Sequence, residues 1–344
     1  MARILYGLCG VGIGHAVRGK VIIDHLKRKH EVMVICSSRP YDYLKNKFNN
    51  VHKIEGFELI FRNNSIADYL TILKNLKKIY RLNLEKLDKI MEEFKPDLVI
   101  SDWETFSSIY AKKNDIPLIS IDNQHFLISG EFDFSKRYLW DYLKAKFIIK
   151  LLMKKADYYI IASFYENKLR KTYKNIFLIP PVLRDEIFKF KPAKKKFILV
   201  YQSTDSYDEL IKILKSTDER FIVYGFDKSS EEKNLKFKKF NERVFLNDLK
   251  DCKAVICNGG FTFISEAVYL KKPILSIPIK GHFEQTLNAL YIKKMNYGEF
   301  YKDLDVERIN LFIKNLDKYK AVKKNQNKND LALKTIDRII GGCK

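Results

Sequence analysis

Cysteine and tryptophan are scarce in this chain of 344 residues, which has five of the first and two of the second. The cysteines form no C-x-x-C pair, and two of them fall inside predicted strands, as reduced buried thiols do. Their positions are Cys9, Cys36, Cys252, Cys257 and Cys343. This pattern argues against disulfide bonds and a zinc site. An aspartate-rich metal motif is also missing, so we expect no bound metal.

Long apolar runs are missing as well. The run "FIIKLLM" is far shorter than the roughly 18 apolar residues of a membrane span, and lysines flank it. The apolar amino-terminal run leads into a glycine-rich loop and a helix, without the small-residue cleavage site of a secretory signal. We therefore expect a cytoplasmic protein.

Acidic residues are few relative to basic ones, with 42 Asp and Glu against 64 Lys and Arg, for a formal net charge of +22. Such an excess suggests an anionic partner: nucleic acid, a nucleotide or phosphorylated substrate, or an acidic membrane surface. A solvated, lysine-rich surface accounts for the charge equally well.

The length of the chain and the order of its predicted elements indicate two domains. Strand-like runs such as "PDLVIS" and "FILVYQS" alternate with helical stretches, which predicts parallel sheets with helices on both faces. In the second half the predicted strands are "RFIVYG", "RVFLND", "CKAVICNGG" and "KPILSIPI". A double proline and a lysine cluster mark a linker. We predict two Rossmann-like α/β domains facing a cleft, at 1–183 and 197–344, with 184–196 as linker and a terminal helix in the second domain.

The amino-terminal stretch "ILYGLCGVGIGHAVRGK" predicts a strand, a glycine loop and a helix. It falls one residue short of the dinucleotide pattern G-x-G-x-x-G, because His15 stands where the third glycine belongs. The next strand ends in Cys36 and two serines instead of the acid that binds the ribose of NAD. These departures exclude a hydride-transfer role.

The most informative block is "CNGGFTFISEAVYLKKPILSIPIKGHFEQTLNA". A strand ends at Cys257, the chain turns at 258–260, and a helix begins near Phe261, so free backbone amides and the positive end of a helix dipole meet where a phosphate can bind. Glu266 lies one helical turn after Thr262, where its carboxylate can accept hydrogen bonds from ribose hydroxyls. Further on, Gln285 and Asn288 lie three residues apart and can bind a polyol.

This block resembles the donor-binding motif of GT-B glycosyltransferases, among them the transferase that forms lipid II and the UDP-glucuronosyl and plant UDP-glucosyl transferases. The resemblance spans both domains and implies a GT-B fold, a UDP-sugar substrate and no cofactor. It implies phosphate binding by Gly259, Gly260 and Thr262, ribose binding by Glu266, and contacts to the donor sugar from Glu284 and Gln285. It also implies that the end of a strand near Phe245 and Leu246 reads uracil through backbone groups. Asn258 replaces the histidine or serine of many relatives, and Gln202 with Ser203 replaces a glycine-rich loop.

The resemblance also covers the first loop, because the first strand in that family commonly ends in a glycine loop whose histidine deprotonates the acceptor. Gly12, Gly14 and His15 match this arrangement. Asp102, in "PDLVISDWETF", matches the aspartate that orients this histidine in plant-type relatives; it serves equally as a cap for the following helix. His125, in "SIDNQHF", is a competing base or an acceptor contact.

The predicted reaction is an inverting, metal-independent transfer from a UDP-sugar to an acceptor hydroxyl. Retaining relatives carry an E-x7-E pair, and counting back from Glu266 reaches Asn258 instead of a glutamate. A UDP-sugar 2-epimerase of the same fold is the first alternative. A basic nucleic-acid-binding protein is the second, although no nucleic-acid module is recognisable.

The stretch "SKRYLWDYLKAKFIIKLLMKKADYYI" mixes lysines, aromatics and aliphatics, as a peripheral contact with an anionic membrane does. An ordinary amphipathic helix packed on its sheet fits the same pattern. In relatives the first domain binds the acceptor. A lipid-linked or glycan acceptor, bound at the inner face of the cell membrane, would account for the basic surface.

Overall fold

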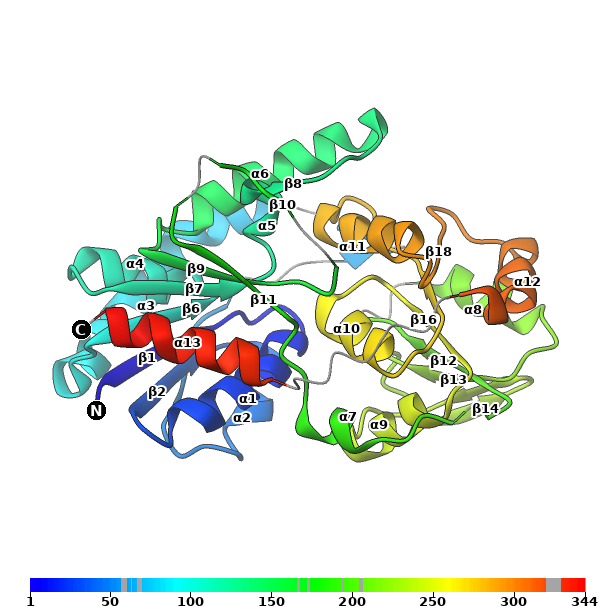
Figure 1. Cartoon of the computed structure of the whole chain (residues 1–344), viewed down its shortest axis with the longest axis horizontal. Helices are drawn as coiled ribbons and strands as arrows, with labels where there is room; N and C mark the ends of the chain where they lie inside the picture. Colours follow the sequence, from blue (N-terminus) through cyan, green and yellow to red (C-terminus); the bar gives the residue numbers. More distant parts are fainter. Residues whose placement is uncertain are drawn as a thin grey trace. The chain divides into compact units, whose positions relative to one another are not determined.

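The computed structural model describes residues 1–56, 61–62, 64–66, 70–165, 168–171, 174–193, 195–203, 207–319 and 329–343. The chain divides into two compact units (Figure 1). The first unit consists of Met1–Leu59, Asp68–Arg184 and Asn327–Lys344, and the second of Ile60–Ala67 and Asp185–Gln326. The chain therefore passes between the two units more than once, whereas the sequence analysis predicted a single central linker.

A seven-stranded parallel sheet forms the centre of the first unit, in the order β11-β9-β7-β6-β1-β2-β3. Its strands are β1 (Arg3–Leu8), β2 (Glu31–Cys36), β3 (Val51–Lys53), β6 (Leu98–Asp102), β7 (Leu118–Asp122), β9 (Tyr158–Ala162) and β11 (Ile176–Ile179). Apolar runs such as "RILYGL" are buried along nearly their whole length, as expected for strands covered on both faces. In the register, Leu8 lies opposite both Cys36 and Asp102, so these strand ends meet at one edge.

Helices follow the strands of the first unit in the predicted alternation. They are α1 (Gly14–Leu26), α2 (Ser38–Leu44), α3 (Leu70–Phe94), α4 (Thr105–Lys113), α5 (Phe126–Ser129), the 3-10 turn η1 (Lys136–Tyr138), α6 (Leu139–Leu152) and α13 (Asp330–Gly342). A short antiparallel pair, β8 (Gly130–Glu131) with β10 (Lys168–Leu169), accompanies them. Leu5, Val99 and Phe106 pack in a core that strands and helices share.

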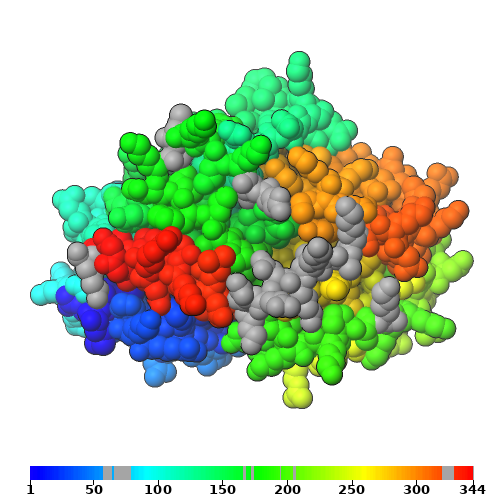
Figure 2. Space-filling model, in the orientation of Figure 1, coloured from blue at the N-terminus to red at the C-terminus, as the bar shows by residue number. Residues whose placement is uncertain are grey.

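The terminal helix α13 belongs to the first unit, so its predicted place in the second domain was wrong. His25 Nε2, on α1, lies 2.8 Å from Asp337 Oδ1, and Asn329 exchanges two hydrogen bonds with the backbone of Leu183 at 3.0 and 2.8 Å. The apolar face of the helix is buried, with Ile336 fully inaccessible. Figure 2 shows the red helix lying against blue amino-terminal and green residues of the same unit. Tertiary packing, which helix periodicity does not encode, determines this position.

The second unit has its own seven-stranded sheet, in the order β14-β15-β13-β12-β16-β17-β18, parallel except where β14 meets β15. The strands are β12 (Ile198–Tyr201), β13 (Phe221–Tyr224), β14 (Ser230–Glu232), β15 (Leu235–Phe237), β16 (Ala254–Cys257), β17 (Ile274–Ser276) and β18 (Gly298–Phe300). Helices α7 (Asp185–Lys189), α8 (Asp208–Lys215), α9 (Glu242–Asp251), α10 (Phe261–Tyr269), α11 (Phe283–Lys294) and α12 (Val306–Lys314), with η2 (Leu316–Lys318), complete it. The hairpin β4 (Phe61–Arg62) and β5 (Ser65–Ile66) also belongs here.

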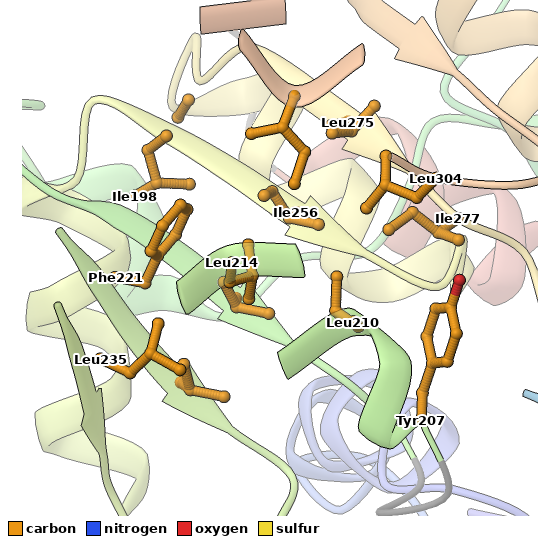
Figure 3. Packing of buried hydrophobic residues seen from close by; sticks show 14 of the residues in the cluster. Ile198, Tyr207, Leu210, Leu214, Phe221, Leu235, Ile256, Leu275, Ile277 and Leu304 are labelled. Carbon is orange, nitrogen blue, oxygen red and sulfur yellow. The ribbon is translucent and has the colours of Figure 1, made fainter. Parts of the chain in front are cut away.

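The core of the second unit gathers strand and helix side chains between β12, β13, β16 and α8 (Figure 3). Ile198, Leu210 and Ile256 are fully inaccessible to solvent, and Phe221 is nearly so. This core accounts for the alternating pattern of the second half, which predicted a second α/β domain.

The predicted linker, 184–196, is attached to the second unit from Asp185 onward. A buried lysine on the loop after α10 contributes to this attachment: Lys272 Nζ donates to the carbonyl oxygens of Ala193, Lys250 and Cys252 at 2.6, 2.7 and 2.6 Å. The lysine thus connects the segment to the end of α9.

We predict that Lys272→Met lowers the free energy of unfolding by about 2–4 kcal/mol, because it removes a charged donor from three carbonyl groups. Chemical denaturation followed by circular dichroism measures the change. The exposed neighbour provides the control, since Lys271→Met should change stability by no more than about 0.5 kcal/mol. Equal effects of the two substitutions would contradict this account of the segment.

Candidate functional site

Two adjacent strands of the first unit end in aspartates that hold histidines. Asp102 is the last residue of β6 and Asp122 the last of β7. His15, in the first turn of α1, places Nδ1 2.7 Å from Asp102 Oδ1. The structure thus brings together two predicted site residues that are 87 positions apart in the sequence.

The glycine loop between β1 and α1 directs His15 toward this carboxylate. Gly12 has φ +77°, a left-handed conformation that glycine adopts without strain, and no atom would meet a Cβ there within 4 Å. Gly14 begins the helix one residue before the histidine. Cys9 N donates to Asp102 O at 3.0 Å, which fixes the start of the loop against the end of β6.

Arg18 completes this cluster, and the sequence reasoning missed it. Its Nε donates to Asp102 Oδ2 at 3.1 Å, its Nη2 donates to Asp102 Oδ1, and its Nη1 lies 3.4 Å from Asn123 Oδ1. Burial lowers the pKa of the guanidinium, but the charge and hydrogen bonds of Asp102 outweigh burial and raise the pKa overall. The sequence could have indicated that Arg18 belongs to the cluster, because it follows His15 by three residues on the same helix and therefore lies on the same helix face.

The contacts of His15 indicate which ring nitrogen carries the proton. His15 Nδ1 lies 2.7 Å from the carboxylate of Asp102, which only accepts hydrogen bonds, and 3.1 Å from Arg18 Nη2, which only donates. We assign the proton to Nδ1 on the shorter of the two contacts. Nε2 then offers a lone pair, and Gln124 Nε2 lies 3.5 Å from it. The His15 side chain is 14% exposed, whereas Asp102 is fully buried. The ring can therefore accept a proton at Nε2 while Asp102 holds its other nitrogen.

The sequence left open whether Asp102 caps the helix that follows it, and the structure shows that it does not. Glu104 is the cap of α4: its carboxylate accepts from Phe106 N at 2.9 Å and Ser107 N at 2.5 Å. Burial raises the pKa of Glu104 even though these bonds favour its charged form. Asp102 is left to pair with Arg18 and His15.

His125 forms a second, separate pair. Its Nδ1 lies 2.6 Å from Asp122 Oδ2, and its ring packs against Tyr159 at a centroid distance of 4.8 Å. Burial raises the pKa of Asp122, but the charge of His125 and the hydrogen bonds to the carboxylate outweigh it and lower the pKa. The histidine borders a cavity of about 290 Å³, which is lined by His125, Ile128, Ser129, Ile149, Lys150, Met153, Lys154, Lys155, Tyr159 and Ile176.

In the second unit, the predicted glycine turn links β16 to α10. Gly259 has φ +119°, and a Cβ there would lie 3.0 Å from Gln285 O, so only glycine fits. Gly260 is the N-cap of α10 and supplies no side-chain cap, and a Cβ on it would meet nothing within 4 Å. Asn288 Nδ2 donates to Gly259 O at 3.0 Å, so this amide holds the turn. A helix start with open space beside it is an arrangement that suits an anion.

Asn258 joins the turn to the end of β12. Its Oδ1 accepts from Ser203 N at 2.7 Å and Ser203 Oγ at 3.1 Å, while its Nδ2 donates to Gln202 Oε1 at 2.6 Å. Nδ2 also lies 3.2 Å from Oδ1 of Asn64, a residue that the sequence reasoning did not single out. The asparagine therefore both donates and accepts hydrogen bonds at this turn.

Two polar atoms near this turn have no hydrogen-bond partner in the described part of the chain. They are Gln202 Nε2 and Ser276 Oγ, both buried. Ser276 Oγ would lie 3.2 Å from a Cβ on Gly259, so it is adjacent to the glycine turn. Buried polar atoms that lack partners are uncommon in folded proteins, and a bound ligand is one way to satisfy them.

The other predicted donor ligands lie on α10 and α11. Glu266 is 1% exposed and follows Thr262 by one turn of α10. Glu284 and Gln285 lie in the first turn of α11, and Gln285 Oε1 accepts a hydrogen bond from Ile279 N at 3.0 Å. That bond anchors the loop before the helix.

The segment near Phe245 and Leu246, which was predicted to be a strand, is a helix, so the strand assignment was wrong. The contact with uracil stays a prediction. Both residues lie inside α9 with buried side chains, and Phe245 N donates to Asn241 O at 2.8 Å. Asn241 caps the helix by accepting from Val244 N at 3.1 Å. The backbone NH of Phe245 is thus used within the helix, and its ring packs against Tyr201 and neighbouring aromatics.

Among the residues that the structure describes, no group of three or more His, Cys, Asp or Glu side chains is placed to hold a metal ion. A search of the same residues finds no helix of the length and apolarity needed to cross a membrane.

Comparisons with known proteins agree with this architecture. A glycosyltransferase of Methanosarcina mazei is 27% identical over 328 residues, covering 86% of this chain and 84% of its own. One from Methanosarcina acetivorans is 27% identical over 332 residues, with the same coverage. MurG of Acinetobacter baumannii has 14% identity and a TM-score of 0.61, over 98% of this chain and 100% of that one. The kitacinnamycin glycosyltransferase has 12% identity and a TM-score of 0.67, over 98% and 99%.

The fold is therefore that of the GT-B glycosyltransferases, as the resemblance implied. The model of glycosyl transferase family 1 matches residues 2–317. The chain belongs to that family, and it is a glycosyltransferase.

We predict that Arg18→Met lowers the free energy of unfolding by about 3–5 kcal/mol, because it leaves the buried charge of Asp102 uncompensated. The double variant Arg18→Met/Asp102→Asn should regain more than half of this loss, since no buried charge remains. Urea denaturation measures both. The control is Arg3→Met, whose partner Asp97 is exposed, with an expected change below about 1 kcal/mol. An Arg18→Met cost no larger than that of Arg3→Met would refute the proposed ion pair.

Proposed function

We propose that this glycosyltransferase moves a sugar from a UDP-sugar to an acceptor hydroxyl with inversion of configuration, using His15 as general base. The observation that carries the proposal is the His15–Asp102 pair, with Nδ1 held at 2.7 Å and the ring partly exposed. No cofactor is required, because the nucleotide sugar is itself the substrate.

The acceptor step assigns a separate task to each residue of the cluster. As the acceptor oxygen attacks the anomeric carbon, its proton moves to His15 Nε2 and the bond from that carbon to the diphosphate breaks, releasing UDP. Asp102 positions the ring and compensates the imidazolium that forms. Arg18 pairs with the buried carboxylate of Asp102 and compensates its charge. Asp102 and Arg18 are thus positioning residues.

The donor end of the proposal rests on the glycine turn of the second unit. The uncapped start of α10, with open space beside Gly260, would hold the diphosphate and stabilise the charge of the leaving group without a metal ion. Thr262 and Glu266 on the same helix would contact phosphate and ribose, and Glu284 with Gln285 the sugar. Ser203, whose backbone NH donates to Asn258, would also contact the diphosphate.

A cytoplasmic site of action fits this chemistry. The five cysteines form no disulfide bond in the part of the chain that the structure describes, and four of them are buried, which suits a reducing compartment.

We predict that UDP binds with micromolar to millimolar affinity and raises the melting temperature, with EDTA present throughout, because a ligand bound only by the native state stabilises it. A thermal-shift series with UDP, GDP, TDP and CMP, followed by calorimetry, identifies the base. Binding of another nucleotide in place of UDP would refute the donor assignment. UDP binding only in the presence of a divalent ion would refute metal independence.

We predict that His15→Ala lowers turnover by about 10² to 10⁴-fold with UDP affinity nearly unchanged, because the interaction it removes forms only as the acceptor proton moves. Turnover is measured on the donor and acceptor that screening selects. His125→Ala serves as the comparison: full activity of His15→Ala together with loss in His125→Ala would transfer the role of base to His125. An isomerised sugar formed without acceptor would favour the epimerase alternative.

Glu266→Ala should weaken UDP binding by about 1.5–3 kcal/mol, the range for hydrogen bonds to a charged group, because the ribose contacts exist before and during the reaction. Calorimetric titration of the variant measures this loss. Glu307→Ala, an exposed glutamate on α12, is the matched control and should bind UDP as the parent does. Equal affinities for all three proteins would exclude Glu266 from the donor site.

A further inference from the structure

Helix α6 of the first unit exposes a row of large apolar side chains. Trp140 is 73% exposed and Phe147 63%, with Leu143 at 42% and Leu151 at 43%. Their spacings of three, four and four residues put them on one face of the helix. We call these four residues the apolar ridge.

The ridge is not the face by which α6 packs on its own unit. That face carries Tyr142 and Ile149, which are 8% and 3% exposed, and the chain after the helix continues it with Met153 at 8%. The helix is therefore anchored from its other side, and packing on the sheet leaves the ridge unexplained. Isolated exposed apolar side chains are ordinary, but an aligned row of four that includes Trp and Phe marks an interaction surface.

The surroundings of the ridge are strongly basic. Between positions 136 and 155 the chain has seven Lys or Arg residues and a single acid, Asp141. The basic residues are Lys136, Arg137, Lys144, Lys146, Lys150, Lys154 and Lys155. None of them forms an ion pair with any residue that the structure describes. Lys150, Lys154 and Lys155 also line the cavity beside His125, together with Ile149 and Met153 of the packing face.

We propose that α6 lies flat on an anionic lipid bilayer, with the apolar ridge entering the boundary between headgroups and acyl chains and the surrounding lysines and arginine contacting lipid phosphates. Apolar side chains combined with cations that have no acidic partner in the described part of the chain complement such a surface in both respects. Trp140, at the amino-terminal end of the ridge, has the amphipathic ring that is typical of membrane interfaces. A helix of 14 residues in this position contacts one leaflet and does not span it.

This inference does not depend on the identity of the donor sugar. It adds a location to the proposed function, because a surface-bound first unit would meet acceptors that are themselves anchored in the bilayer. Its test uses binding alone, so it stands or falls separately from the assignment of His15.

The full chain is sedimented with vesicles of phosphatidylcholine and with vesicles in which phosphatidylglycerol replaces part of it. Binding is expected to the anionic vesicles at low salt, and it should weaken as salt rises, since surface attraction is screened over about 10 Å at 0.1 M. Trp140→Ser/Phe147→Ser should weaken it by about tenfold or more. Lys150→Gln/Lys154→Gln/Lys155→Gln should remove most of the preference for anionic lipid. Leu311→Ser, at a site on α12 that is 52% exposed, is the matched control and should bind as the parent does.

Tryptophan fluorescence gives a second measurement that does not depend on sedimentation. The chain has two tryptophans, so Trp103→Phe leaves Trp140 as the single reporter. Anionic vesicles should shift its emission to shorter wavelength and protect it from an aqueous quencher. Far-UV circular dichroism and melting curves establish that each variant is folded.

Three results would overturn the proposal. One is equal sedimentation with neutral and anionic vesicles at low salt, including none with either. Another is undiminished binding of the folded ridge variant. The third is concentration-dependent self-association that the ridge variant abolishes while vesicles have no effect, which would make a second copy of the chain the occupant of this surface.

Discussion

The carboxylate of Asp102 has no contact with water, and this constraint organises the amino-terminal half of the site. A charge in that position must be paired, and Arg18 pairs it from the helix that follows the glycine loop. Because His15 precedes Arg18 by one helical turn, the ion pair also determines where the imidazole lies. The glycine loop is held at its start by the hydrogen bond from Cys9 N to Asp102 O and at its end by this ion pair. The buried ion pair thus also aligns a third residue, His15.

The sequence sufficed to predict the parts of this fold that are encoded locally. The strand, glycine loop and helix around His15 were predicted correctly, as was the turn at Gly259, because each depends on a few neighbouring residues. The segment near Phe245 was not, since a short apolar run fits strand and helix periodicity alike and the deciding residue was the cap at Asn241. The position of α13 depends on contacts with distant parts of the chain, such as His25 with Asp337, which no local pattern reveals. Arg18 was missed because an arginine in a helix is ordinarily a surface residue.

The two histidine–aspartate pairs at adjacent strand ends show how environment separates similar constellations. Both use Nδ1 and a carboxylate at the end of a parallel strand. Asp102 also has a guanidinium in contact, whereas Asp122 receives a serine hydroxyl, from Ser120 at 2.7 Å. His125 is enclosed by Trp103 and Tyr159, while the His15 ring is more open. The sequence motif alone would assign both histidines the same chemistry. Their different surroundings support our choice of His15 over His125 as the proposed base.

The division of the chain into units affects how relatives of this protein can be recombined. The chain passes from one unit to the other four times, at 59/60, 67/68, 184/185 and 326/327. A chimera joined once near position 184 would therefore take Asn64 from one parent and its partner Asn258 from the other. The same chimera would separate α13 from the α1 it packs against. Exchange of whole units between glycosyltransferases of this kind thus requires the segment 60–67 and the terminal helix to move with the parent whose unit they complete.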